Sequence, residues 1–369
     1  MANDSNDRSD DREERQTPAP AGRMVWPDIV RAVAIVAMIA GHAADAGFGT
    51  FGARTLQWQV CNFYDSLVRF SVPVFVMVSG MFLLNPQKEY DLKKLYSAKI
   101  LRMATAFFFW STFYSIVYLL ALRSGNGNRY GHDDLYIFVR GVLFGHFHMW
   151  FILMISGLYI VTPVLRLIAA NEKITLYFLV LGLGFVCVPN MLQLFPPARR
   201  LLGSTISRLE VNLVAGYSCY FMLGYWLSTH PLPAAARKAI CILGILAAIG
   251  TVVLNGFMGY HFNVTGRWMY KNLLPNILLI SVAVFVFCRY HRWQLSASWQ
   301  KFIGAVGRWG FGIYLVHAFF LDHMSWFGLP HFFCHPAVSI PVTTAFVFFA
   351  SLGTVFLLEK IPVINKYII

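Results

Sequence analysis

Four ionisable residues interrupt an otherwise apolar stretch near the start of the chain. Asp28 and Arg31 stand at one end of "DIVRAVAIVAMIAGHAADAG", and His42 and Asp45 stand at the other. An ionisable side chain in the hydrocarbon of a membrane costs roughly 2.5–3.5 kcal/mol on insertion scales. A helix that only anchors a chain in lipid gains nothing from such residues, so this pattern indicates chemistry or binding.

Helix geometry places the four residues on one face. Arg31 and His42 are eleven positions apart, so they lie within about 20° of each other and about 16 Å apart along the axis. Asp28 can pair with Arg31, and Asp45 can approach His42. The alternative is purely structural: a buried Asp28–Arg31 pair that stabilises helix packing, with His42 at the membrane interface.

A polar stripe of this length suits a ligand with an anionic end and a reactive end. Arg side chains bind phosphates well, and a neutral imidazole can act as a general base near neutral pH. A CoA thioester has this shape, with its phosphates near Arg31 and its thioester near His42. We therefore expect His42 to be the base, and a covalent acyl-His intermediate is an open alternative.

The composition is that of a membrane protein. The 369 residues are 57% hydrophobic and only 13% charged, which lies outside the range of soluble domains. Residues 1–23 are polar and contain no apolar run, so we expect a short disordered cytoplasmic tail and no signal peptide. The net charge of +13 is attributed to Lys and Arg in cytoplasmic loops, where these residues collect in helical membrane proteins. No nucleic-acid partner is therefore expected.

Runs of about 20 apolar residues predict an all-α, polytopic protein with about ten transmembrane helices. The expected spans lie near 25–45, 66–84, 100–122, 149–169, 174–195, 210–229, 239–258, 271–288, 308–326 and 337–358. Lys and Arg residues outside these spans favour an arrangement with both termini in the cytoplasm. The segment 134–148 is expected to be a half-buried helix.

Three other features of the sequence are weaker signals. The outer loop containing Arg199, Arg200 and Arg208 is either an ordinary solvated loop or a contact for an acidic ligand. The six cysteines form no CxxC pair and are expected to be small buried apolar residues, although a disulfide between Cys61 and Cys334 is open. The "HFH" and "HFFCH" clusters supply no four-ligand set, so no metal site is expected.

The order of short motifs along the chain resembles that of the acyltransferase-3 family of integral-membrane O-acyltransferases. The family's first helix carries an Asp, an Arg and a His with the spacing of Asp28, Arg31 and His42. Three further segments are similar to family motifs: "VPVFVMVSGMFLL" with Ser79 and Gly80, the cations Lys99 and Arg102 that open the third helix, and "GFGIYLVHAF" with Tyr314, Leu315 and His317. Lys99 departs from the family pattern, which weakens bidentate phosphate binding but keeps the charge.

The resemblance implies a function and its ligands. Residues 24–369 would form one transmembrane acyltransferase domain in a bacterial inner membrane, with acyl-CoA, most often acetyl-CoA, as cytoplasmic co-substrate and no permanently bound cofactor. The acceptor would be a sugar hydroxyl of an envelope or exported glycan. The segment "HMWFILMISGLYIVTPVLR" is most similar to the WecH-like branch of surface-polysaccharide O-acetyltransferases. Arg31, Lys99 and Arg102 would then hold the CoA phosphates.

Several other side chains are candidates for the same site. Arg69, expected at the level of His42, stabilises the oxyanion or grips the acceptor, unless it only reaches the membrane interface. Ser79 either donates to the thioester or allows close helix packing. His148 and Trp150 suit sugar binding or an ordinary aromatic belt. By the resemblance, Tyr314 and His317 would also bind substrate. The imidazole of His317 at mid-depth is costly unless it is paired or lines a cavity.

Two other function classes fit the same residues. Intramembrane Asp, Arg and His also build the ion pathways of proton-coupled transporters of small solutes. An envelope scaffold protein without enzymatic activity is the other alternative. The lipid bilayer is a partner under every interpretation, and the sequence does not indicate an oligomeric state.

Overall fold

The computed structural model describes residues 24–126, 133–192, 194, 213–214 and 216–369. The N-terminal tail 1–23 lies outside this part, as do Arg199, Arg200 and Arg208 of the outer loop. Every element is a helix, and the described residues contain no strand. The helices are α1 (Trp26–Asp45), α2 (Gly47–Thr50), α3 (Leu56–Val68), α4 (Ser71–Leu83), α5 (Leu92–Lys94), the π-helical η1 (Leu95–Ile100), α6 (Leu101–Asn126), α7 (Asp133–Phe144), α8 (Trp150–Ala169), α9 (Glu172–Leu192), α11 (Tyr217–Thr229), α12 (Ala234–Phe262), α13 (Pro275–Tyr290), α14 (Ala297–Asp322), the 3₁₀ turn η2 (Met324–Phe327), α15 (Pro336–Leu358) and α16 (Pro362–Tyr367).

Within the described residues, eight helical segments are long and apolar enough to cross a membrane. This confirms the all-α, polytopic architecture. At the other two expected positions stand α11 and α13, which have 13 and 16 residues and are shorter than a full crossing. The second crossing begins at Leu56, ten positions before the expected start, because α3 and α4 together form one segment from Leu56 to Leu83.

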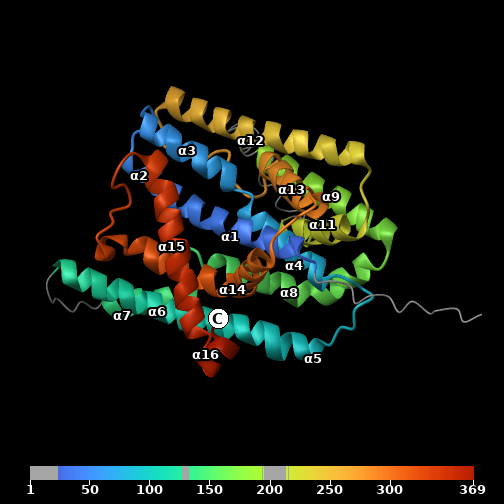
Figure 1. Cartoon of the computed structure of the whole chain (residues 1–369), viewed down its shortest axis with the longest axis horizontal. Coiled ribbons are helices and arrows are strands. Elements are labelled where there is room, and N and C mark those ends of the chain that lie inside the picture. Colours follow the sequence, from blue (N-terminus) through green and yellow to red (C-terminus); the bar gives the residue numbers. More distant parts are fainter. Residues whose placement is uncertain (1–23, 127–132, 193, 195–212, 215) are drawn as a thin grey trace, which may run out of the picture.

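Helix α1 lies in the middle of the bundle (Figure 1). It packs against α3, α4, α13, α14 and α15. Its residues Val30, Ala34, Ile35 and Ile39 are fully buried and form part of the common core. They lie on more than one side of the helix, because Val30 and Ile39 are nine positions and thus about 180° apart. The charged residues of α1 are therefore held in the centre of the protein, away from lipid.

Helices α4 and α11 pack closely through two glycines. A Cβ atom at Gly80 would lie 1.8 Å from the carbonyl oxygen of Phe221, and one at Gly224 would lie 2.0 Å from that of Met77. Each helix thus needs a glycine where the backbone of the other approaches. Gly80 of the Ser79–Gly80 pair therefore allows α4 to pack closely against α11.

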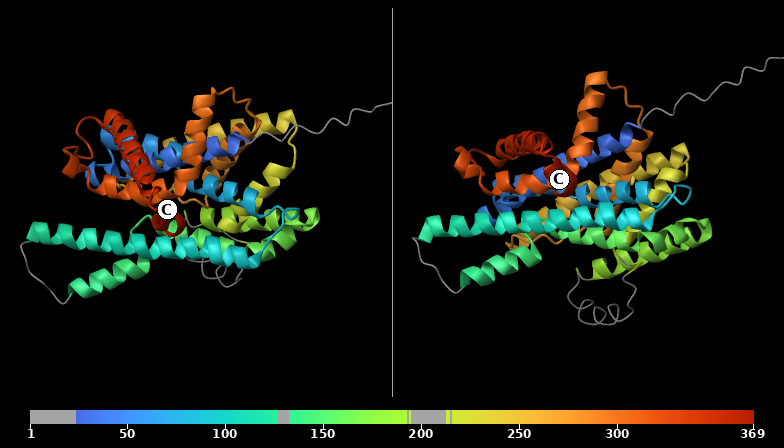
Figure 2. Two further views of the ribbon diagram at one scale, coloured as in Figure 1. Left: turned by 60° about the horizontal axis from the view of Figure 1, so that its bottom comes forward. Right: turned by 90° about the horizontal axis from the view of Figure 1, so that it is seen from below.

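Helices α6 and α7 run side by side along one edge of the molecule (Figure 2). The expected helix at 134–148 is present as α7, and its side chains Leu135, Tyr136, Leu143 and Phe144 are exposed.

All six cysteines are free. Cys61 is buried and Cys334 is exposed, so the disulfide left open from the sequence is not formed.

Candidate active site

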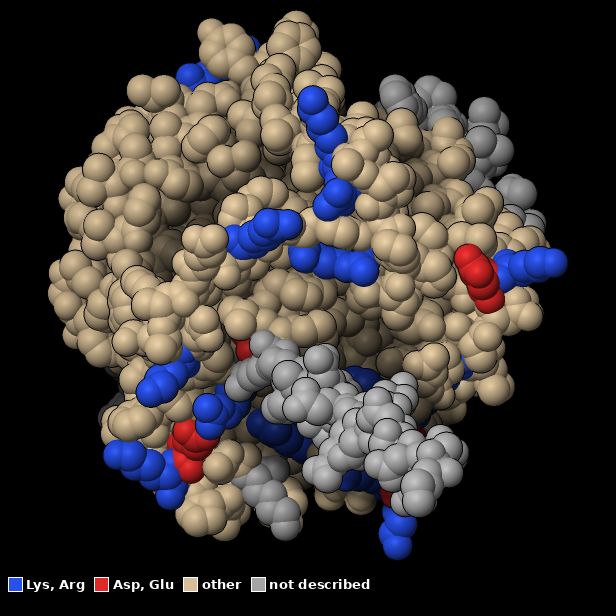
Figure 3. Space-filling view, turned by 45° about the vertical axis from the view of Figure 1, so that its right-hand side comes forward, with Lys and Arg blue, Asp and Glu red and all other residues tan. Residues whose placement is uncertain are grey.

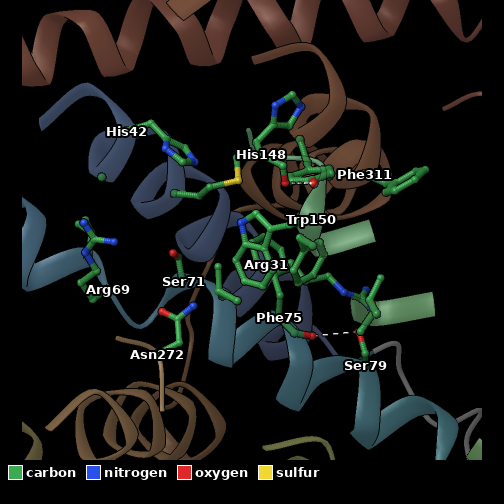
Figure 4. Close-up of a pocket in the computed structure, with 18 of the residues that line it drawn as sticks. Arg31, His42, Arg69, Ser71, Phe75, Ser79, His148, Trp150, Asn272 and Phe311 are labelled. Atoms are coloured by element: carbon green, nitrogen blue, oxygen red, sulfur yellow. Dashed lines mark hydrogen bonds between the residues drawn. The ribbon is translucent and has the colours of Figure 1, made fainter. Parts of the chain in front are cut away.

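A cavity of about 630 Å³ lies along α1, between α4, α6, α8 and α14 (Figure 4). This volume is typical of pockets for small ligands. Arg31 and His42 both line it, so it extends about 16 Å along the helix axis. The face shared by these two residues is therefore turned towards one continuous space.

At one end of the cavity Asp28 holds Arg31. The Oδ1 atom of Asp28 is 3.2 Å from Nη1 of Arg31, and the guanidinium lies 4.7 Å from the centre of the Phe82 ring. Asp28 is buried and is not part of the cavity wall. A Cβ atom at Gly307 would lie 2.8 Å from Asp28 Oδ1, so this glycine lets α14 approach the pair.

Three further cations surround the same end of the cavity. Lys99, Arg102 and Arg308 of α14 line it together. Arg102 also donates through Nη2 to the carbonyl oxygen of Ile369. Lys and Arg outnumber Asp and Glu on the face of the molecule near α4 and α5 (Figure 3). This end of the cavity is suited to an anion with several charges.

Ser79 lines the cavity between its two ends. Its hydroxyl donates to the carbonyl oxygen of Phe75 at 2.9 Å, within the same helix (Figure 4). Because a hydroxyl oxygen also accepts hydrogen bonds, Ser79 can interact with a second group, and the hydroxyl of Tyr159, which also lines the cavity, is one such partner.

At the other end of the cavity His42 lies among aromatic rings. Its ring centre is 5.3 Å from that of Phe147 and 5.4 Å from that of His317, and the two imidazole planes differ by 26°. No hydrogen bond joins the His42 ring to the described part of the chain. Asp45 does not approach His42 as expected, because its carboxylate is 2.9 Å from Nη1 of Arg267 and 3.7 Å from Nη2 of Arg69.

Arg69 lines the cavity at the same end as His42, and its charge is balanced by two carboxylates. It pairs with Asp65, which is fully buried one helical turn earlier, as well as with Asp45. The guanidinium also lies 4.5 Å from the centre of the Tyr270 ring. Among the described residues, Oδ1 of Asp65 and Nε of Arg69 have no hydrogen-bond partner.

The four residues expected to bind substrate divide into two groups. His148, Trp150 and Tyr314 line the cavity, whereas His317 is fully buried behind His42 and is not part of the wall. The Tyr314 hydroxyl donates to the carbonyl oxygen of His148 at 2.6 Å. His317 therefore lies behind the wall, in contact with His42, His148 and Tyr314, which corrects its expected role as a residue that binds substrate directly.

Two imidazoles of the segment between α7 and α8 are kept neutral by burial. Burial lowers the pKa of His146 to about 4, with a smaller contribution from His323. Burial also lowers the pKa of His148 well below its ordinary value, with further contributions from His317 and His146. At neutral pH each ring thus carries one N–H donor and one nitrogen acceptor.

Sequence reasoning missed several residues of this site. Asp65 stands four positions before Arg69, a spacing that could have indicated the pair. Arg267 lies between α12 and α13, far from Asp45 in the chain, and no local pattern indicates their contact. Arg308 stands at the first position of the expected span 308–326, where a cation is typical of a cytoplasmic helix end and does not indicate a cavity.

Residues 24–360 match the model of the acyltransferase-3 domain, which is described as an acyltransferase domain. No curated protein and no solved structure shows a significant match to this chain.

Proposed function

Because the chain belongs to the acyltransferase-3 family, we propose that it moves an acyl group, most simply acetyl, from acyl-CoA to a sugar hydroxyl of an envelope or exported glycan. The observation that supports this proposal is the single cavity that joins four cations at one end to His42 at the other. The cations suit the CoA phosphates, and the pantetheine arm can span the distance between the two ends.

The cations divide the work of binding the donor. Arg31 is oriented by Asp28, so its remaining N–H groups can face the cavity. Lys99 and Arg308 supply further positive charge, and Arg102 has N–H groups beyond the one that contacts Ile369. Ser79 lies between these cations and His42, where its hydroxyl can contact the thioester arm.

The chemistry assigned to His42 balances without an external acid or base. A neutral His42 takes the proton of the acceptor hydroxyl while the oxygen attacks the thioester carbonyl. The resulting oxyanion is stabilised by Arg69, and its collapse breaks the carbon–sulfur bond. The imidazolium then returns the proton to the departing thiolate, which leaves as the thiol of CoA.

The proposed setting is a bacterial inner membrane with both termini in the cytoplasm. Acyl-CoA is made in the cytoplasm, so the Arg31 end would face that side and the His42 end would face outwards. The preponderance of Lys and Arg on the face near α4 and α5 supports this orientation. The acceptor, by the resemblance to the WecH-like branch, would be a surface polysaccharide or its lipid-linked precursor.

The test is acetyl transfer from radiolabelled acetyl-CoA into extractable envelope glycans. Cells would carry the wild type, His42→Ala, the control His261→Ala or an empty vector, at matched protein levels. His261 is exposed at the end of α12 and is not part of the cavity wall. We expect label with the wild type and the control, and at least a hundredfold less with His42→Ala. Equal label in all four would refute the acyltransferase proposal and favour a transporter.

A further inference from the structure

The cavity wall near His42 differs in chemistry from the cationic end. Trp150 of α8, Ser71 of α4 and Asn272, which precedes α13, all line the cavity. Ser71 follows Arg69 by two positions, and Figure 4 shows the Ser71 hydroxyl and the Asn272 amide pointing towards the space that His42 borders. An indole ring, a hydroxyl and an amide thus surround the place where the acceptor must bring its hydroxyl to His42.

Ser71 and Asn272 each present a polar atom that a ligand can reach. Within the described residues, neither Oγ of Ser71 nor Oδ1 of Asn272 has a hydrogen-bond partner. Neither atom is among the buried polar atoms that are closed off from solvent. The Trp150 side chain is also accessible, with 42% of its surface exposed. All three side chains can therefore contact a molecule in the cavity.

Tyr217 at the start of α11 fixes both the amide and the indole. Nδ2 of Asn272 donates to the Tyr217 hydroxyl at 2.9 Å, and the rings of Tyr217 and Trp150 have centres 5.9 Å apart. The Tyr220 hydroxyl donates to the backbone carbonyl oxygen of Asn272 at 2.6 Å, which holds the segment before α13 in place. One polar atom of the Asn272 amide is thus used by Tyr217, and the other remains for a ligand.

The charged side chains of the wall at this end balance one another. Arg69 pairs with Asp65 and Asp45, and Arg267 lies 2.9 Å from the carboxylate of Asp45. Two cations and two carboxylates have a formal charge of zero, in contrast to the cationic end of the cavity. An anionic acceptor would therefore gain no net attraction from this part of the wall.

A sugar ring without a charged group fits this wall. The C–H face of a pyranose ring is apolar, and stacking on the Trp150 indole removes apolar area of both partners from water. The hydroxyl groups at the edge of the ring donate and accept hydrogen bonds, so they can bind the Asn272 amide and the Ser71 hydroxyl. Aromatic walls with a few placed polar groups are typical of pockets that fix the orientation of such ligands.

We propose that Trp150, Asn272 and Ser71 form the acceptor subsite and hold an uncharged sugar residue with one hydroxyl next to His42. Tyr217 is a positioning residue that orients the amide and the indole. This inference rests on the proposed acyltransferase function and deepens it, because it names the class of sugar and the side chains that bind it.

The first test measures transfer from acetyl-CoA to an extract of envelope glycans by the full chain in lipid nanodiscs. Trp150→Leu should raise the apparent KM for the glycan about 10-fold, and Asn272→Ala about 3- to 10-fold. The KM for acetyl-CoA should stay within twofold, because its phosphates bind at the other end. Trp150→Phe, which keeps an aromatic ring, should recover most of the loss. An unchanged glycan KM in Trp150→Leu or Asn272→Ala would overturn the inference.

A double-variant cycle tests the role of Tyr217. Tyr217→Phe removes the hydroxyl that binds the Asn272 amide and keeps the ring beside Trp150. It should raise the glycan KM about 3-fold alone and have no further effect in Asn272→Ala. Independent effects would show that Tyr217 does not act through Asn272. If Asn272→Ala does not fold, Ser71→Ala takes its place in the first test, with an expected rise of about 3-fold.

The second test identifies the sugar residue that receives the acetyl group. Transfer from acetyl-CoA labelled with ¹³C at the carbonyl marks the glycan, and NMR correlation of that carbon with the sugar protons shows which residue carries it. We expect an uncharged residue, such as a hexose, a deoxyhexose or an N-acetylhexosamine. An acetyl group on a residue with a carboxylate or a phosphate would overturn the proposed class of acceptor.

Two control variants change the same residue types away from the cavity. Trp299 is exposed near the start of α14 and Asn190 is half-buried in α9, and neither is part of the cavity wall. Trp299→Leu and Asn190→Ala should match the wild type. No transfer by the wild type would refute the proposed function. Transfer by the wild type with an unchanged glycan KM in the wall variants would overturn this inference alone.

Discussion

Replacing Arg69 by methionine separates its structural role from a role in catalysis. Asp65 is fully buried beside Arg69, whereas Asp45 keeps Arg267 as a second partner. Removing one member of a buried ion pair costs about 3–5 kcal/mol, because the other charge stays buried without compensation. Arg69→Met should therefore lower stability by about this amount. The double variant Arg69→Met/Asp65→Asn should recover most of the lost stability, because it no longer buries the unpaired charge of Asp65.

The assay measures stability and activity on the same preparations. Stability is the temperature at which half of the purified protein in detergent loses its monodisperse peak, and activity is acetyl transfer per folded molecule. The double variant should be nearly as stable as the wild type but transfer about 10²–10³ times more slowly, the cost of losing one oxyanion donor. Arg54→Met is the control, because Arg54 contacts the carbonyl oxygen of Tyr260 at the surface and should change stability by less than about 0.5 kcal/mol.

Two results would refute this reasoning. If Arg69→Met is as stable as Arg54→Met, the buried pair does not stabilise the fold. If the double variant transfers acetyl at the wild-type rate, Arg69 serves only to balance Asp65, and another group stabilises the oxyanion.

Two further predictions concern packing and pH. Gly80→Ala should lower stability by about 1–3 kcal/mol, because its Cβ would meet the backbone of α11. Gly157→Ala should be neutral or stabilising, because its Cβ would meet nothing within 4 Å. Equal thermal stability of the two variants would contradict the close approach of α4 and α11. The pKa of His146 falls from 6.5 to about 4 on folding, so the folded state binds fewer protons, and the free energy of unfolding should decrease as the pH falls from about 6.5 towards about 4. His146→Phe should flatten that decrease in a pH series of thermal unfolding, and an unchanged slope would show that His146 is not responsible.

Much of the fold follows from local composition. A run of about 20 apolar residues can satisfy its backbone in lipid only as a helix, so the all-α membrane class and most crossings could be read from the chain. The close approach of α4 and α11 could not be read in this way, because Gly80 and Gly224 each face the backbone of the other helix. That approach is a property of two segments, and neither one shows it alone.

The candidate site divides in the same way. The common face of Arg31 and His42 was determined by the sequence, because helical spacing depends only on position along one segment. Only the tertiary structure decided that Asp45 pairs with Arg267, that His317 lies behind His42, and that Asp322 reaches His146. These contacts join segments that are distant in the chain, and no periodicity within one helix encodes the partner that another helix brings to it.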